Sequence, residues 1–141
     1  MKLKALSTNG VFVLMMACSS LANADIAVIV NPSFAGELSE DKTAQIFLGQ
    51  LQQFPNGNTA IPVDQKPGSQ ARNEFHAKVT QKSESKLEAY WAARTFTGKG
   101  QPPKELNTDQ DVIRHVADNP NVIGYVNAVS IDQSVRVLFV K

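Results

Sequence analysis

The sequence predicts an α/β fold in which helices flank a small mixed sheet. Runs rich in β-branched residues at 26–30 and 122–126 have the length and composition of buried strands. Between these runs, apolar residues recur at helical spacing, and clusters of glycine, proline and asparagine separate the segments. Because strands and helices alternate along the chain, we expect a layered domain with helices packed on the sheet.

The N-terminus has the features of a signal peptide. Lys2 and Lys4 precede a short apolar run at 11–17, and the sequence Ala-Asn-Ala at 22–24 has small residues where signal peptidase requires them. The apolar run is too short for a permanent transmembrane helix, which needs about 20 residues. We therefore expect cleavage after the second of these alanines, Ala24, and export to the periplasm.

A signal peptide of residues 1–24 leaves one domain, 25–141, with room for one modest core. The only cysteine, Cys18, falls in the signal peptide, so the domain has no disulfide and no thiol chemistry. Lipid anchoring at Cys18 is an alternative, although Met15 then stands where a lipoprotein signal normally has leucine. Without the two lysines of the signal peptide, 12 basic side chains face 13 acidic ones, a balance that does not favour nucleic-acid binding.

Local signals predict the first strand and the first helix of the domain. Residues 26–30 are apolar throughout, which favours a strand buried on both faces, and the asparagine and proline in 31–33 end it. Ser39 is placed to cap a helix that Gly49 ends, and 54–58 is a turn. The buried face of this helix is expected to contain Thr43, Ile46 and Phe47.

A second strand, a turn and a second helix follow in close succession. Residues 61–63 indicate the strand, and Pro67-Gly68 is a strong turn signal. Ser69 stands where a helix N-cap would stand, so the helix begins near Gln70. Its apolar line at four-residue steps consists of Ala71, Phe75 and Val79.

A third helix is expected near Ser85, because Ser85 and Glu88 have the spacing of a capping box. Its apolar face contains Leu87, Tyr90 and Trp91. Two glycines and a proline pair make 97–103 a loop. Taking all segments together, we expect the core to include Trp91, Tyr90, Phe75, Phe47 and Ile123.

A fourth helix and two strands complete the predicted domain. The helix is expected to start after Thr108 and to end at Asn119-Pro120. Gly124 lies inside the strand 122–126, which indicates a close approach of another element to its backbone. Residues 135–140 form the last strand. The inward side of the helix consists of Val112, Ile113, Val116 and Ala117.

The connection between the second strand and the second helix carries the functional prediction. Ligands of α/β sheets gather at the carboxyl ends of strands, and a helix N-terminus offers free N–H groups and a partial positive charge. The predicted anion-binding residues are Ser69, Gln70, Ala71, Arg72, Asp64 and Gln65. In the structural alternative, Ser69 only caps its helix and Arg72 is solvated.

Seven short motifs follow one another in the order typical of one protein family. The first four are Val28-Ile29-Val30-Asn31, Ile46-Phe47-Leu48-Gly49, Ile61-Pro62-Val63 and Gly68-Ser69-Gln70-Ala71-Arg72. The later three are Tyr90-Trp91, Phe96-Thr97-Gly98 and Ile123-Gly124-Tyr125-Val126. In this order the chain resembles the phosphate-binding receptors of bacterial ABC importers, within the type 2 periplasmic binding protein superfamily, and especially their short members with one lobe.

The resemblance implies a single lobe of the type 2 periplasmic binding protein fold with phosphate or another small oxyanion as ligand. It also implies a membrane partner such as an ABC permease, a sensor or a porin, and a homodimer that completes the site is a further option. The family's glycine and threonine are replaced by Gln70 and Ala71, and its upstream arginine falls at Asp64 or Gln65. These departures predict weak binding, because a charge-assisted hydrogen bond to an anion contributes about 1.5–3 kcal/mol.

Two other classes of function are alternatives to anion binding. An interaction domain that has kept the fold and lost the ligand is the alternative to a binding module. An enzyme is not expected, because His76 and His115, the only histidines, match no catalytic spacing, and Ser69 lacks a G-x-S-x-G elbow. No metal site or cofactor is expected either.

Overall fold

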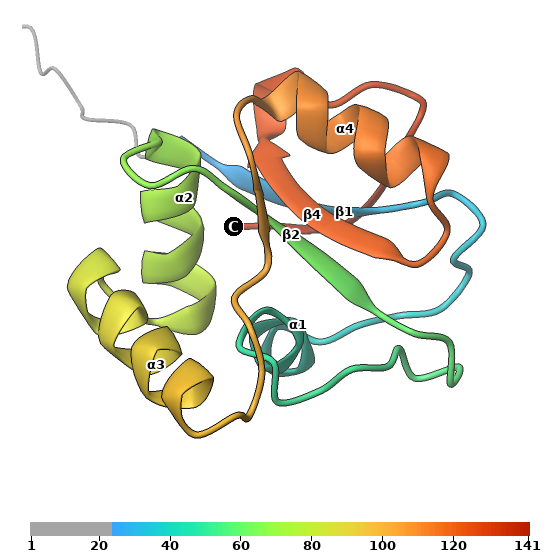
Figure 1. Ribbon diagram of the computed structural model, residues 1–141. Coiled ribbons are helices and arrows are strands. Elements are labelled where there is room, and N and C mark those ends of the chain that lie inside the picture. Colours follow the sequence, from blue (N-terminus) through green and yellow to red (C-terminus); the bar gives the residue numbers. More distant parts are fainter. Residues whose placement is uncertain (1–23) are drawn as a thin grey trace, which may run out of the picture.

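The computed structural model describes residues 24–141, so the predicted signal peptide, apart from Ala24, lies outside the described residues. One mixed sheet has the strand order β3-β2-β4-β1-β5 (Figure 1), with β2 parallel to β3 and β4, and β1 antiparallel to β4 and β5. The strands are β1 (Ile26–Val30), β2 (Ile61–Gln65), β3 (Lys104–Leu106), β4 (Val122–Asn127) and β5 (Arg136–Val140). The helical elements are α1 (Glu40–Phe47), α2 (Gln70–Phe75), a π-helical turn η1 (His76–Thr80), α3 (Glu84–Phe96), α4 (Asp109–Asp118) and a 3-10 turn η2 (Ala128–Ser130). The predicted α/β fold with a small mixed sheet is confirmed.

Helices cover both faces of the sheet, with α1 and α2 on one face and α4 on the other (Figure 1). The alternating residues of β1 explain why this strand is apolar throughout. Ile26, Val28 and Val30 join the core under α1 and α2, whereas Ala27 and Ile29 join the core under α4. In residues 24–141, no helix is both long and apolar enough to cross a bilayer.

The glycine predicted to allow a close approach does so. A Cβ atom on Gly124 would lie 2.6 Å from Cγ1 of Val112 in α4 and 3.1 Å from Cγ2 of Val63 in β2. Both distances are shorter than ordinary van der Waals contact. Gly124 therefore sets how closely α4 packs on β4, and it fixes the position of the carboxyl end of the sheet.

Four of the five predicted core residues, Phe47, Phe75, Trp91 and Ile123, are buried. The fifth, Tyr90, is only half-buried, so this part of the prediction is wrong. Its ring packs against Trp91 at a centroid distance of 5.2 Å, and its hydroxyl donates a hydrogen bond to the carbonyl oxygen of Leu48. A phenol at the edge of the core buries its ring and still satisfies its hydroxyl.

Three boundaries differ from the predicted ones. The helix α3 is capped by Ser83, whose Oγ accepts a hydrogen bond from the N–H of Lys86, so the capping box proposed at Ser85 is wrong. The strand β3, which the sequence did not predict, forms because Lys104–Leu106 pairs with the open edge of β2. The strand β2 continues to Gln65, which places Asp64 and Gln65 in the sheet instead of in the following loop.

Candidate functional site

The predicted anion-binding residues lie where β2 ends and α2 begins. Gly68 turns the chain with a φ of 86°, a conformation that favours glycine. Ser69 is the N-cap of α2, and its Oγ accepts a hydrogen bond from the N–H of Arg72 at 3.2 Å. The predicted cap is therefore confirmed.

The two backbone donors of the predicted site, the N–H groups of Gln70 and Ala71, lie in the first turn of α2. Between residues 24 and 141, neither of these N–H groups donates a hydrogen bond. The side chain of Gln70 is exposed, whereas that of Ala71 is buried against the core. These two N–H groups are the part of the predicted site that has no hydrogen-bond acceptor among residues 24–141.

Arg72 is neither solvated nor directed at an open loop. Its side chain is buried, with only 7% of its surface exposed. Its Nε and Nη2 atoms each donate to one carboxylate oxygen of Glu84, at 2.9 Å, and its Nη1 donates to the carbonyl oxygen of Gln65 at 2.9 Å. A paired, planar contact of this kind is the strongest that a guanidinium makes with a carboxylate.

Two further carboxylates face the same guanidinium. Nη1 of Arg72 lies 3.7 Å from Asp64 Oδ2 and 3.5 Å from Glu105 Oε1. Burial lowers the pKa of Arg72, but the hydrogen bonds that it donates to Glu84 and the charges of Asp64 and Glu84 outweigh burial and raise this pKa above its usual value. The guanidinium is thus fully ionised and is held by internal anions.

Asp64 is the centre of a buried polar network that the sequence did not reveal. Its Oδ1 accepts hydrogen bonds from the N–H of Gln65 and from the hydroxyl of Tyr125, and its Oδ2 lies 2.9 Å from Nε2 of His76. On the other side of the imidazole, Nδ1 lies 2.8 Å from Oγ1 of Thr80. A ring that carries its proton on Nε2 satisfies both contacts. We refer to Asp64, Arg72, His76, Glu84 and Tyr125 as the Arg72 cluster.

The network shifts the pKa values of Asp64 and Tyr125. Burial raises the pKa of Asp64, but its hydrogen bond with His76, assisted by Tyr125 and the charge of Arg72, outweighs burial and lowers this pKa. Burial and the neighbouring charge of Asp64 raise the pKa of Tyr125 well above its usual value. Asp64 is therefore an anion in the folded protein, and Tyr125 is a neutral hydrogen-bond donor.

Local backbone geometry brings His76 to this network. His76 follows Arg72 by one helical turn, so the two side chains lie on the same side of the helix. The π-helical turn η1 then ends at Gln81, which has a φ of 57°. The four-residue spacing of Arg72 and His76 indicates in the sequence that both lie on one side of a helix. Their shared partner becomes apparent only in the structure, where β2 extends to Asp64.

The structure turns the side chain of Gln65 away from the other predicted residues, although its carbonyl oxygen accepts the hydrogen bond from Nη1 of Arg72. Gln65 follows Asp64 in a strand, so its side chain points to the opposite face of the sheet. There its Nε2 donates to Asp109 Oδ1 at 2.7 Å and to the carbonyl oxygen of Tyr125 at 3.1 Å. Asp109 also accepts hydrogen bonds from Asn127 and Ser130. Gln65 thus ties β2 to α4 and lies away from Ser69.

The arrangement of Asp64, His76 and Thr80 contains the residue types of a nucleophilic relay. However, the Thr80 side chain is buried, and its hydroxyl also lies 3.2 Å from the carbonyl oxygen of His76 in the same helical turn. These contacts support a structural role for Asp64, His76 and Thr80. In the described part of the chain, no group of three or more His, Cys, Asp or Glu side chains is placed to hold a metal ion.

Comparison with known proteins identifies the fold. No family model matches the sequence, and no curated protein does. Among solved structures, a putative phosphate ABC transporter substrate-binding protein with bound phosphate from Clostridium perfringens matches 82% of this chain and 45% of its own length, with 21% identity and a TM-score of 0.63. An ABC-type phosphate transport receptor from Vibrio cholerae matches 82% of this chain and 47% of its own, with 17% identity and a TM-score of 0.61. PstS from Borrelia burgdorferi matches with 16% identity and a TM-score of 0.59.

These comparisons confirm the predicted resemblance at the level of the fold. The chain spans less than half the length of the receptors that it matches. Its sheet and helices follow the architecture of one part of those phosphate receptors, as the order of short motifs predicted. At identities of 21% and below, the likeness concerns the fold alone.

Proposed function

We propose that this protein is an exported domain of the solute-receptor type that binds phosphate, or another small oxyanion, weakly as part of transport or sensing. The observation that carries the proposal is the fold, which is shared with three structures described as phosphate receptors or PstS. The start of α2 supports it, because the N–H groups of Gln70 and Ala71 make no hydrogen bond with residues 24–141. The proposed membrane partner is an ABC permease, a sensor or a porin.

The proposed anion site consists of the first turn of α2 and the guanidinium of Arg72, with Ser69 at the cap and Asp64 and Gln65 at the strand end. In this arrangement the anion competes with the carboxylate of Glu84, which takes two N–H groups of Arg72 at 2.9 Å. The side chain of Glu84 is 31% exposed, so it can swing into solvent, whereas Asp64 is buried and stays in place. We expect an affinity no better than about micromolar, near −8 kcal/mol.

The competition by Glu84 provides the test. Phosphate is titrated into the wild type, Glu84→Gln and Glu88→Gln, with calorimetric detection. Glu84→Gln removes the competing charge and should raise phosphate affinity about tenfold, which corresponds to roughly 1.4 kcal/mol. Glu88 is the matched control, because it lies one turn along α3, is exposed and lines the same surface hollow as Glu84 without contacting Arg72.

A second substitution locates the anion. Arg72→Lys keeps the positive charge and loses the paired N–H groups, so in the Glu84→Gln background it should return phosphate affinity to the wild-type level or below. Equal phosphate affinity in all four proteins would contradict the proposed site. It would favour the second candidate, an interaction domain that has lost its ligand. The internal ion pairs of Arg72 favour that candidate, since they satisfy the guanidinium without any anion.

Export and assembly are separate parts of the proposal. We expect the secreted chain to begin at Asp25, because small residues at 22–24 follow a short apolar run. Intact-mass measurement of the secreted protein checks this, and an acylated N-terminal Cys18 in the membrane fraction would contradict it. A homodimer that completes the site would appear in sedimentation as a mass twice that of the monomer.

A further inference from the structure

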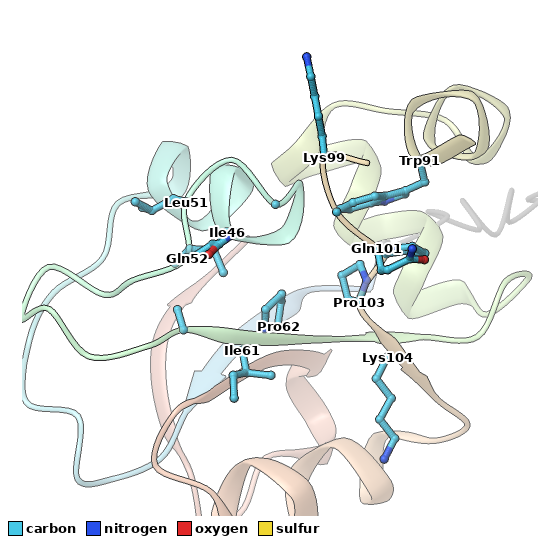
Figure 2. Close-up of a pocket in the computed structure, with 14 residues that line it drawn as sticks. Ile46, Leu51, Gln52, Ile61, Pro62, Trp91, Lys99, Gln101, Pro103 and Lys104 are labelled. Atoms are coloured by element: carbon cyan, nitrogen blue, oxygen red, sulfur yellow. The ribbon is translucent and has the colours of Figure 1, made fainter. Parts of the chain in front are cut away.

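A second site is indicated by a cavity of about 310 Å³ that shares Trp91 and Pro102 with the hollow next to Arg72. The turn after α1, the start of β2 and the loop 99–104 form its walls. Figure 2 shows Trp91, Gln101 and Pro103 on one side and Ile46, Leu51 and Gln52 on the other. These segments are far apart in the sequence. We call this cavity the Trp91 pocket.

The walls of the Trp91 pocket contain one flat aromatic ring, the indole of Trp91, and proline rings. Trp91 is the only tryptophan of the chain, and Pro62 and Pro103 also line the cavity. Beside these rings stand the side-chain amides of Gln52 and Gln101, which both donate and accept hydrogen bonds. Binding sites for small molecules typically combine an apolar wall with a few polar groups.

The charges around the Trp91 pocket have one sign. Its lining includes Lys99 and Lys104 and no acidic residue. In Figure 2 the side chains of Lys99 and Lys104 both extend away from the indole, in opposite directions, so neither ammonium group occupies the cavity. The two lysines give the lining of the pocket a positive charge, which favours anionic ligands over cationic ones.

Neighbouring contacts fix the shape of the pocket before any ligand arrives. Nη2 of Arg94 donates to the carbonyl oxygen of Gly49 at 3.1 Å and to that of Lys99 at 3.3 Å, so one guanidinium joins two walls. Gly49 has a φ of 69°, and a Cβ atom there would lie 3.1 Å from Cη2 of Trp91. The backbone at Gly49 thus lies against the edge of the indole, and a preformed site binds without a large ordering cost.

We propose that the Trp91 pocket binds a small organic anion built on one flat ring, of the arylcarboxylate class. The ring packs against the indole of Trp91, and the carboxylate faces Lys99 at the mouth. The volume lies at the lower end of the range for small-molecule sites, about 300–1,000 Å³, which limits the ligand to a single ring system. This inference goes beyond the proposed oxyanion binding, because both the ligand class and the residues differ.

The test uses three probes of nearly the same shape. Phenylacetate is anionic, phenylacetamide is neutral and phenethylamine is cationic, and each is titrated while the fluorescence of Trp91 and the heat of binding are recorded. We expect phenylacetate to change the fluorescence to saturation, with a Kd of about 1 mM or below. The amide should bind about tenfold more weakly, and the amine should not bind in the same range.

Charge reversal at the mouth is the matched test in the protein. Lys99→Glu should weaken phenylacetate binding about tenfold, whereas Lys86→Glu should leave it unchanged, because Lys86 is exposed on α3 outside the pocket lining. Phosphate should not compete with phenylacetate, which separates this proposal from oxyanion binding. The proposal is overturned by the absence of a saturable response to phenylacetate, by equal affinity for the amide, or by an unchanged affinity in Lys99→Glu.

Discussion

The Arg72 cluster and the Trp91 pocket lie next to each other, and Trp91 and Pro102 line the hollows on both sides. In the Arg72 cluster, each charged side chain is in contact with a partner of opposite charge or with a hydrogen-bond donor. The walls of the Trp91 pocket face a cavity of about 310 Å³. The polar region therefore has little free capacity for a ligand, while the apolar region has surface available.

This difference has an energetic basis. A buried charge without a partner costs several kcal/mol, so a chain that places Asp64 and Arg72 in its interior must supply their partners itself. An apolar wall that faces an open pocket forgoes hydrophobic burial of about 25 cal/mol per Å², which costs less than a buried charge without a partner. The cluster should thus matter more for stability, and the pocket should matter more for binding.

The largest expected effect is a loss of stability on disrupting the Arg72 cluster. Asp64→Ala removes the acceptor shared by His76 and Tyr125 and leaves polar groups buried without a partner. We expect the free energy of unfolding to fall by about 3–5 kcal/mol, as for a broken buried ion pair. Urea unfolding measures it. Asp41→Ala, at an exposed acid in the first turn of α1, is the control and should cost less than about 1 kcal/mol.

The dependence of stability on pH tests whether the charge of Asp64 contributes to the stability of the Arg72 cluster. The pKa of Asp64 is lower in the folded protein than the value of about 3.9 in the unfolded chain. Its contribution to stability is therefore complete above about pH 4 and is lost as the pH falls through the folded-state pKa. We expect the stability difference between wild type and Asp64→Asn to narrow below pH 4 in urea unfolding. A difference that stays constant down to pH 2 would show that the charge of Asp64 contributes nothing.

Much of the fold was predictable because local signals and tertiary packing agree. The apolar strand at Ile26–Val30, the cap at Ser69 and the glycine inside β4 each carry their physical cause in the sequence itself. The strand β3 could not be predicted, because Lys104–Leu106 has no strand pattern and forms only by pairing with β2. Tyr90 was placed too deep, since helical spacing does not show that its hydroxyl bonds to Leu48.

The two sites differ in how far the sequence revealed them. The start of α2 was visible as a short continuous motif, but the carboxylate that holds Arg72 comes from Glu84, twelve residues further on. His76 and Tyr125 were missed as polar partners because each also fits an apolar segment. The sequence does not predict the Trp91 pocket, since its walls come from four separate parts of the chain. Such a site has no motif.

A smaller loss of stability is expected from a substitution at Arg94, which joins two walls of the Trp91 pocket. Arg94→Ala removes the hydrogen bonds to the carbonyl oxygens of Gly49 and Lys99. We expect a loss of about 1.5 kcal/mol in unfolding free energy, with faster amide hydrogen exchange confined to the loop 97–103. Arg114→Ala is the control, because Arg114 is exposed on α4, and its change should stay within about 0.5 kcal/mol. Unchanged exchange in the loop would mean that the pocket is not braced by Arg94.

The smallest expected effect separates capping from anion binding at Ser69. Three serines cap helices with nearly the same geometry, because Oγ of Ser39, Ser69 and Ser83 accepts a backbone N–H at 3.2, 3.2 and 3.3 Å. Replacing any of them with alanine should cost about 1 kcal/mol of stability, measured by urea unfolding. Only Ser69→Ala should also weaken phosphate binding, and calorimetry in the Glu84→Gln background is the sensitive measurement. If all three variants bind phosphate equally, Ser69 is a cap and nothing more, and the start of α2 is a structural element like the starts of α1 and α3.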